Sequence, residues 1–360
     1  MEVIEVKDHK EQKLFLDFRR KLYKESSLYV DNNLFLIQEL FSGKTSFVND
    51  KEIYAFNVKD SNNIVCQGIV VYASDLSDYI QLCFFESLPG QDEAAKLLVD
   101  KAIEIGKKHN CKKLVIGLNG HVNYGLGLLC DHYDEKNTFS SAANPKFYND
   151  YFDKMDLEKV YLCTYRSVTD HTRIERYASL LRKIKKNYEF KSFDKKNFDE
   201  YSKIYTDLNN QAFEGHRYYY KRNYKEDKEM LKELFLFMKE DSLIFAFKDG
   251  EPVGFVMWYP DYNELAKGGE VFGVRHFFRN IFMGRKIKYG KLMEYGVLPQ
   301  HRKSGLVMGL LDQVYISMQG HGIQNLVSSW VLEENVDSNS VCQALCDEKY
   351  KRYVVYEKEI

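Results

Sequence analysis

The sequence lacks an excess of either charge, any long apolar run and any secretory leader. Its 52 Lys and Arg against 53 Asp and Glu give a formal net charge of -1, and this balance disfavours a nucleic-acid partner. No window approaches the roughly 18 consecutive apolar residues of a membrane-spanning helix, so no transmembrane segment is expected. The first residues are charged and are not followed by an apolar stretch with a cleavage site, so no secretory signal is expected.

The sequence also lacks a cysteine motif. Its seven cysteines are widely spaced, without C-x-x-C pairs and without histidines at metal-ligand spacing. This pattern indicates reduced thiols in a cytoplasmic protein with no metal site, and most of the seven are expected to be small buried hydrophobes. They are Cys66, Cys83, Cys111, Cys130, Cys163, Cys342 and Cys346.

What remains is the composition of a folded protein. Of the 360 residues, 44% are hydrophobic and 15% are aromatic. At roughly 150 residues per domain, this length predicts two domains, each large enough to bury a core.

Hydrophobic periodicity predicts the same order of elements twice. In the first half the predicted elements are a strand at 2–6, a helix at 9–24, a hairpin at 53–58 and 64–72, a strand at 79–85, a helix at 91–108 and strands at 114–118 and 160–165. In the second half they are a strand at 189–193, a helix at 197–208, a hairpin at 244–247 and 253–259, a strand at 288–298, a helix at 305–318 and strands at 326–332 and 353–357. We therefore predict two α/β (α+β) domains of one fold, at residues 1–167 and 168–360, each a mixed, mostly antiparallel twisted sheet flanked by helices.

The most informative segment is the turn from a strand into a helix at 297–311. A helix start offers backbone N–H groups without intrahelical partners and the positive end of the macrodipole, which favours an anionic phosphate. Gly305 would let the backbone approach a phosphate, and Arg302, Lys303 and Ser304 add charge and a donor. An ordinary turn with a solvated basic edge is the alternative.

The pattern V-x-P-x-x-R-x-x-G before an apolar helix resembles the acetyl-coenzyme A loop of the GCN5-related N-acetyltransferase (GNAT) superfamily, R/Q-x-x-G-x-G/A. Arg302 and Gly305 match, while Val307 stands where glycine or alanine is usual. Other stretches are similar to a bacterial subgroup of long, uncharacterised tandem GNAT-like proteins; they lie at 117–129, 144–148, 252–255, 260–263, 329–335, 349–353 and 356–358. The resemblance implies a tandem GNAT protein that transfers an acyl group from coenzyme A to an amine.

The resemblance also implies roles for residues of the second half. The backbone N–H of Val297 or Leu298 would polarise the acyl carbonyl, and Glu294 would be the base, although a glutamate facing solvent or paired with Lys291 is an equal alternative. The predicted cofactor-binding residues are Val297, Leu298, Arg302, Lys303, Ser304, Gly305, Leu306, Val307 and Asn335.

The general acid departs from the family pattern. The usual acid is a tyrosine seven residues after an asparagine that follows the late strand, and counting from Asn335 reaches Cys342. Tyr350, Tyr353 or Cys342 could take its place. In the first half, the loop at 86–93 contains no Arg or Lys and carries Asp92 and Glu93, so that half is not expected to bind coenzyme A in this way.

Residues 274–291 form a basic and aromatic segment without an acidic residue. As an amphipathic helix it could contact an anionic membrane, receive a long acyl chain or meet an acidic acceptor. We favour an insertion helix whose aromatic residues pack on the sheet.

The leading hypothesis is a cytoplasmic N-acyltransferase, a monomer or homodimer, that uses acetyl-coenzyme A or a longer acyl-coenzyme A as co-substrate. Its acceptor would be a small-molecule or peptide amine, with no nucleic acid and no metal, and a peripheral membrane contact is not favoured. One alternative is a coenzyme A-binding or regulatory protein that has lost transfer. Another resembles N-acyl amino acid synthases, with the segment at 274–291 forming an acyl tunnel.

Overall fold

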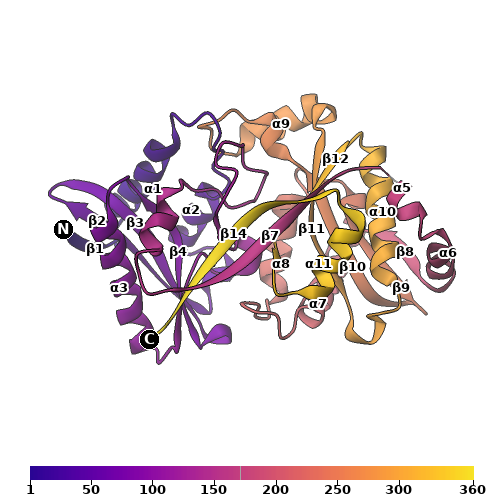
Figure 1. The fold of residues 1–360 in the computed structure, drawn as a ribbon, viewed down its shortest axis with the longest axis horizontal. Coiled ribbons are helices and arrows are strands. Elements are labelled where there is room, and N and C mark those ends of the chain that lie inside the picture. The colour runs from indigo at the N-terminus through magenta and orange to yellow at the C-terminus, as the bar shows by residue number, and fades with distance from the viewer. Residues whose placement is uncertain (171) are drawn as a thin grey trace.

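One continuous 14-stranded sheet runs through the molecule (Figure 1). The structure, a computed structural model, describes residues 1–170 and 172–360. The strand order is β1-β2-β3-β4-β5-β14-β7-β12-β11-β10-β9-β8, while β6 pairs with β14 and β13 pairs with β7. This architecture confirms the predicted α/β class with a large, mostly antiparallel sheet flanked by helices.

The first half, residues 1–167, supplies one end of this sheet. Its helices are α1 (His9–Tyr23), α2 (Leu34–Ser42), α3 (Asp92–Lys108) and α4 (Phe147–Phe152). Its strands are β1 (Glu2–Glu5), β2 (Lys51–Asp60), β3 (Asn63–Ala73), β4 (Tyr79–Ser87), β5 (Lys113–Ile116), β6 (Leu128–Leu129) and β7 (Glu158–Val168). The strands β4 and β5 are parallel because the crossover helix α3 joins them.

The second half, residues 168–360, repeats this plan. Its helices are α5 (Thr172–Glu175), α6 (Ala178–Asn187), α7 (Phe198–Ala212), α8 (Tyr224–Leu234), α9 (Val274–Met283), α10 (Leu306–Gly320) and α11 (Val336–Leu345). Its strands are β8 (Glu189–Ser192), β9 (Leu243–Lys248), β10 (Glu251–Pro260), β11 (Tyr289–Val297), β12 (Asn325–Ser328), β13 (Val331–Leu332) and β14 (Glu348–Glu359). An Asp249–Gly250 turn with positive φ at both residues joins β9 to β10, as the twist of a tight hairpin requires.

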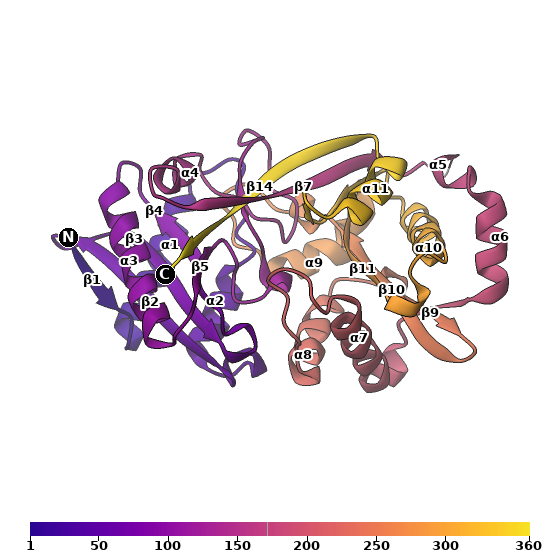
Figure 2. The same cartoon turned by 60° about the horizontal axis from the view of Figure 1, so that its bottom comes forward.

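The two halves exchange their last long strands. β14, from the C-terminus, lies between β5 and β7, and β7, from the first half, lies between β14 and β12. Figures 1 and 2 show the two strands side by side as they cross the middle of the molecule. Each half therefore completes its sheet with a strand from the other, which the repeat in the sequence did not predict.

Helices cover both faces of the second half's sheet. On β10, the neighbours Gly254 and Phe255 point to opposite faces. A side chain at Gly254 would meet Leu306 of α10, whereas Phe255 contacts Tyr205 of α7. The helices α7 and α8 thus lie on one face and α10 on the other. None of the helices in the described ranges is both long and apolar enough to cross a bilayer.

The helix α9 does not pack as predicted. Only one side of it is anchored, through Phe277 against Phe237 and the Asn280 side-chain amide to the Phe237 carbonyl at 3.1 Å. Phe278 and Phe282 are exposed. The expectation that the aromatic residues of this segment pack on the sheet was therefore wrong for these two, because the anchoring contacts come from residues on the opposite side of the helix.

The exchange of strands predicts that the halves fold together. Expressed alone, residues 1–167 lack β14 and would leave the edges of β5 and β7 unpaired; we expect no cooperative thermal transition and rapid cleavage by protease. Co-expression with residues 168–360 should restore a cooperative transition and protease resistance. A cooperative melt of residues 1–167 alone would contradict this prediction.

Candidate active site

The strands β11 and β12 separate at their C-terminal ends. They pair in parallel only as far as Leu292 and Ser328, and a last hydrogen bond joins the Ser329 amide to the Leu292 carbonyl at 2.7 Å. Beyond this point β11 continues to Val297 paired with β10 alone, after a bulge opposite Met257 and Trp258. The result is a gap in the sheet beside the last residues of β11.

Two backbone amides of β11 face this gap. The Leu298 amide donates to the Val253 carbonyl at 3.0 Å, so Leu298 points toward β10. Because hydrogen bonding alternates along an antiparallel pair, the amides of Val297 and Tyr295 point the other way, and neither has a partner in the described part of the chain. Of the two amides predicted to hold an acyl carbonyl, Val297 is therefore available and Leu298 is not.

The loop after β11 also presents free donors. Gly305 has φ 82° and precedes α10. Ser304 accepts a hydrogen bond from the Leu306 amide at 3.2 Å. Within residues 1–170 and 172–360, the amides of Lys303, Gly305 and Val307 make no hydrogen bond. Three unpaired N–H groups at a helix start are suited to an anionic phosphate.

Arg302 does not have the expected freedom, and a side chain of α6 lies close to the loop. The Arg302 guanidinium donates to the Ala212 carbonyl at 2.7 Å and to the Val297 carbonyl at 3.4 Å, so it ties the loop to the end of α7. Leu180 of α6 lies over Gly305, because a Cβ added there would come within 3.0 Å of it. The backbone, more than the Arg302 charge, is thus the part of the loop that is open to a phosphate.

Glu294 is half-buried on the face covered by α7. It accepts hydrogen bonds from the Tyr205 hydroxyl and from the Asn209 amide, the latter at 3.0 Å. Burial raises the pKa of this carboxyl to about 7, which is suited to a base at neutral pH. Lys291 is not its partner. Sequence reasoning missed Tyr205 and Asn209, whose only signal was their spacing of four residues on a helix.

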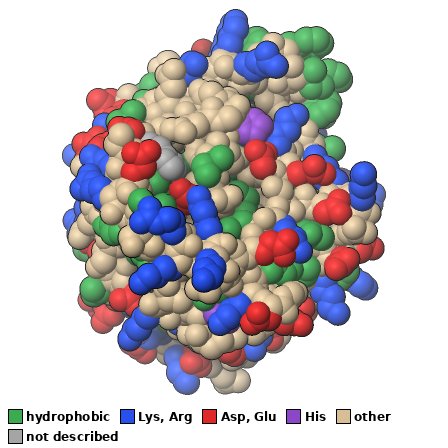
Figure 3. All heavy atoms as spheres, turned by 90° about the vertical axis from the view of Figure 1, so that its right-hand side faces the viewer, with side chains coloured by type: hydrophobic (Ala, Val, Ile, Leu, Met, Phe, Trp, Pro, Cys, Tyr) green, Lys and Arg blue, Asp and Glu red, His purple; other side chains and the backbone are tan. Residues whose placement is uncertain are grey.

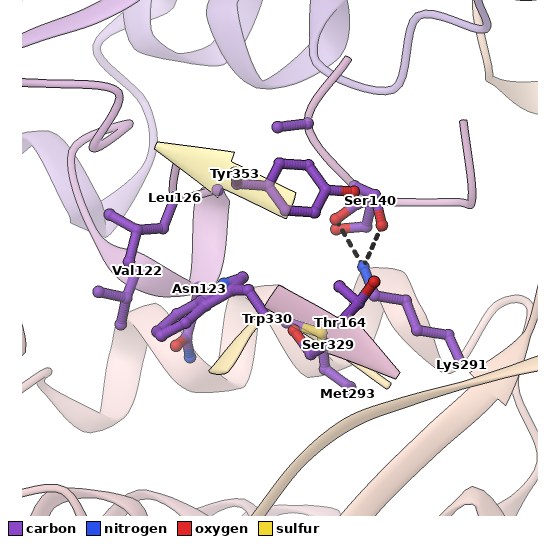
Figure 4. A pocket seen from close by; sticks show the side chains of 13 residues that line it. Val122, Asn123, Leu126, Ser140, Thr164, Lys291, Met293, Ser329, Trp330 and Tyr353 are labelled. Carbon is purple, nitrogen blue, oxygen red and sulfur yellow. Dashed lines mark hydrogen bonds between the residues drawn. The ribbon is translucent and has the colours of Figure 1, made fainter. Parts of the chain in front are cut away.

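A small pocket opens where β11 and β12 separate, and both halves line it (Figure 4). Met293, next to Glu294, and Trp330 come from the second half, while Ser140 and Thr164 come from the first. The Tyr353 side chain, from the exchanged strand β14, reaches into the same pocket toward Ser140. Burial raises the pKa of Tyr353 above its usual range, so this hydroxyl stays protonated and can donate.

Lys291 anchors the first half to this pocket. Its ammonium is buried and donates to the carbonyls of Phe139 and Ser140 at 3.1 and 2.8 Å and to the Ser141 hydroxyl at 3.0 Å. Burial lowers the pKa of Lys291 to about 7. One lysine of β11 therefore fixes the loop that forms the opposite wall.

Replacing Lys291 should destabilise this junction. Lys291→Met leaves the Phe139 and Ser140 carbonyls without their donor, and a buried polar group without a partner costs about 1–3 kcal/mol. We expect the free energy of unfolding, measured by urea denaturation, to fall by about that amount. Lys288→Met, at an exposed residue three positions earlier, is the control. Equal stability of the two variants would show that Lys291 does not hold the loop.

The remaining predicted residues lie outside the pocket. Tyr350 binds the Glu135 carboxylate. The Asn335 side chain caps α11 by accepting from the Ser338 amide at 3.1 Å. Cys342 is buried in α11, and burial raises its thiol pKa to about 12. Among the three candidate acids, only Tyr353 lines the pocket.

The first half has the same strand register without the free amide. Its Leu88 amide donates to the Val65 carbonyl at 2.9 Å, as Leu298 does to Val253. The amide of Ser87, at the position of Val297, donates to the Tyr148 hydroxyl at 2.8 Å. Asp92 pairs with Lys154. In the first half, Tyr148 of α4 thus accepts from the amide whose counterpart, at Val297, is free in the second half.

Comparison with known proteins finds a family match within the second half of the chain. Residues 199–346 match the acetyltransferase (GNAT) family. Protein YghO of Escherichia coli strain K12 is 22% identical over 263 residues, which are 71% of this chain and 67% of that protein.

Solved structures share the fold over most of the chain. A tandem GNAT protein from the clavulanic acid biosynthesis pathway aligns over 99% of this chain and 98% of its own, with TM-score 0.56 and 13% identity. A fungal GCN5-related glucosamine N-acetyltransferase region gives TM-score 0.57 and 12% identity over 99% of this chain and 38% of its own. A GCN5-related N-acetyltransferase from Sphaerobacter thermophilus gives 0.50 and 10% over 90% of this chain and 85% of its own. Residues 199–346 thus match the acetyltransferase (GNAT) family, and the chain has the fold seen in tandem GNAT proteins.

Proposed function

We propose that this protein is an acyl-coenzyme A-dependent N-acyltransferase whose reaction takes place in the gap between β11 and β12. The observation that carries the proposal is the row of unpaired amides, at Tyr295 and Val297 in the gap and at Lys303, Gly305 and Val307 in the loop. The first set is suited to a thioester carbonyl and the second to a pyrophosphate. Val297, Lys303, Gly305 and Val307 thus stay in the proposed binding set.

Bound acyl-coenzyme A would supply a thioester, whose C–S bond breaks as the acceptor nitrogen forms the new C–N bond. The Val297 or Tyr295 amide donates to the carbonyl oxygen as it becomes negative. Glu294 accepts the proton that the amine nitrogen loses, and its pKa of about 7 lets it do so at neutral pH. Tyr353 donates a proton to the departing thiolate. The acceptor would be a small-molecule or peptide amine that enters on the α7 side, where Glu294 lies.

A second candidate is a coenzyme A-binding protein without transfer activity. The observation that favours it is Cys342 at the position of the usual tyrosine, buried and with its pKa raised to about 12. Its thiol is held in α11, outside the pocket that contains Tyr353. This candidate would bind coenzyme A through the same residues as the enzyme but would not transfer the acyl group.

Calorimetry with acetyl-, octanoyl- and palmitoyl-coenzyme A, followed by thiol release against a panel of amines, separates the two. The enzyme is expected to bind at least one of them and to release thiol with some amine. Absence of binding would overturn both candidates, whereas binding without thiol release would favour the second. A rise in affinity with chain length would identify a long-chain acyl donor.

A further inference from the structure

The exposed side of α9 is an apolar stripe that no described part of the chain covers. Val274, Phe278, Ile281 and Phe282 follow one another at spacings of four, three and one residues, so they share one side of the helix. Phe282 is 82% exposed and Val274 69%. Figure 3 shows hydrophobic side chains gathered at the upper right, where α9 lies, with Lys and Arg beside them at the top. Monomeric proteins rarely leave such a stripe in water without a use.

The orientation of α9 is fixed by contacts on its other side. Buried His276 stacks on Phe272 at 4.7 Å between ring centroids and lies 3.0 Å from Glu270. Arg279 donates to both oxygens of the Glu270 carboxylate, at 2.6 and 3.1 Å. Rotation of α9 to bury the stripe would break these buried contacts. The exposure of the stripe is therefore a property of the folded protein.

The surroundings of the stripe are basic. Between residues 264 and 288 the chain carries six basic and two acidic side chains. Glu270 is held by Arg279, and Glu264 accepts the backbone amides of Lys288 and Tyr289. Arg285, Lys286 and Lys288 are exposed next to the apolar residues. We define the α9 surface as Val274, Phe278, Ile281, Phe282, Arg285 and Lys286.

The positive charge of the α9 surface indicates which partner would bind there. A two-fold dimer through the α9 surface would bring the basic side chains of both copies into one interface, and the α9 surface contains no acidic residue to pair with them. An anionic bilayer offers phosphates at the level of the basic side chains and an apolar layer beneath for the protruding aromatic rings.

We propose that the α9 surface docks the protein on an anionic lipid bilayer, with Phe278, Ile281 and Phe282 inserted at the headgroup boundary. This docking does not depend on the proposed acyl transfer. It differs from the expectation drawn from the sequence, in which membrane contact was the disfavoured interpretation of residues 274–291. The difference comes from the exposure of the stripe.

Flotation of the full-length protein with lipid vesicles tests the proposal. Vesicles of phosphatidylcholine with about a quarter phosphatidylglycerol are compared with phosphatidylcholine alone, at about 0.1 M salt. The protein is expected to float at least about tenfold more with the anionic vesicles, and higher salt should reduce this difference. Equal flotation with the two compositions, or none with either, overturns the proposal.

Two pairs of substitutions separate the apolar and the charged contributions. Ile281→Ser with Phe282→Ser removes the insertion, and Arg285→Glu with Lys286→Glu reverses the charge; each pair is expected to reduce flotation about tenfold or more. The control, Lys10→Glu with Lys13→Glu on α1, makes the same charge change at exposed residues and should float like the wild type. Full binding by either α9 pair overturns the proposal. So does a concentration-dependent dimer, measured by light scattering, that Ile281→Ser with Phe282→Ser abolishes, because the surface then serves a second copy.

Discussion

Glu294→Gln is expected to lower the turnover number of acyl transfer by about 10²–10⁴ while leaving the affinity for acyl-coenzyme A unchanged. The amide keeps the size of the side chain and can still contact Tyr205 and Asn209, but it cannot take a proton from the acceptor amine. Steady-state thiol release gives the turnover number, and calorimetry gives the affinity. A loss of both together would indicate a damaged fold instead of a missing base.

The pH profile sharpens this test. A base works only when deprotonated, and burial raises the pKa of Glu294 to about 7, so the wild-type rate is expected to rise as the pH increases through about 7. Glu294→Gln should lack this rise. Glu200→Gln, at an exposed residue of α7, is the matched control and should keep both rate and profile. If Glu294→Gln kept the wild-type profile, another group would be the base.

Gly305→Glu is the second substitution with a large expected effect, a loss of acyl-coenzyme A binding by about two orders of magnitude or more. With φ 82°, this position is costly for any residue with a Cβ, by roughly 1–2 kcal/mol. The Cβ would also meet Leu180 at 3.0 Å. The new carboxylate would lie among the free amides of Lys303 and Val307 and would repel a phosphate.

Two controls separate the effect of the new carboxylate from that of the backbone strain and from that of a glutamate placed elsewhere. Gly305→Ala introduces the strain without the carboxylate and should bind better than Gly305→Glu. Gly90→Glu makes the same change in the corresponding loop of the first half, where φ is 75° and nothing lies within 4 Å of an added Cβ. It should leave affinity unchanged, and thermal melts check that all three variants fold. If Gly90→Glu abolished binding and Gly305→Glu did not, coenzyme A would bind in the first half.

The sequence predicted what depends on local patterns. The hairpins, the crossover helices and the turn at 297–311 follow from alternation, helical spacing and turn residues, and the structure confirms them. Glu294 could be singled out because it lies on the strand before the loop. The helices α2 and α8 were missed, although their apolar residues are partly periodic.

What the sequence could not predict depends on contacts between distant residues. The binding of Arg302 to the end of α7, the position of Leu180 over Gly305 and the engagement of the Leu298 amide with Val253 involve partners separated by 45 to 125 residues. The exchange of β7 and β14 is of the same kind, because either half has the strands to close its own sheet. From the sequence, Tyr353 could not be distinguished from Tyr350, and its position beside Ser140 separates the two.

The place of β14 in the sheet also concerns how the protein is synthesised. A ribosome releases the chain from its N-terminus, and domains usually fold in that order. Here β5 and β7 must wait for residues 348–359, which leave the exit tunnel about 180 residues after β7. The nascent first half therefore exposes two strand edges until β14 has been synthesised, a period in which a chaperone would have most to protect.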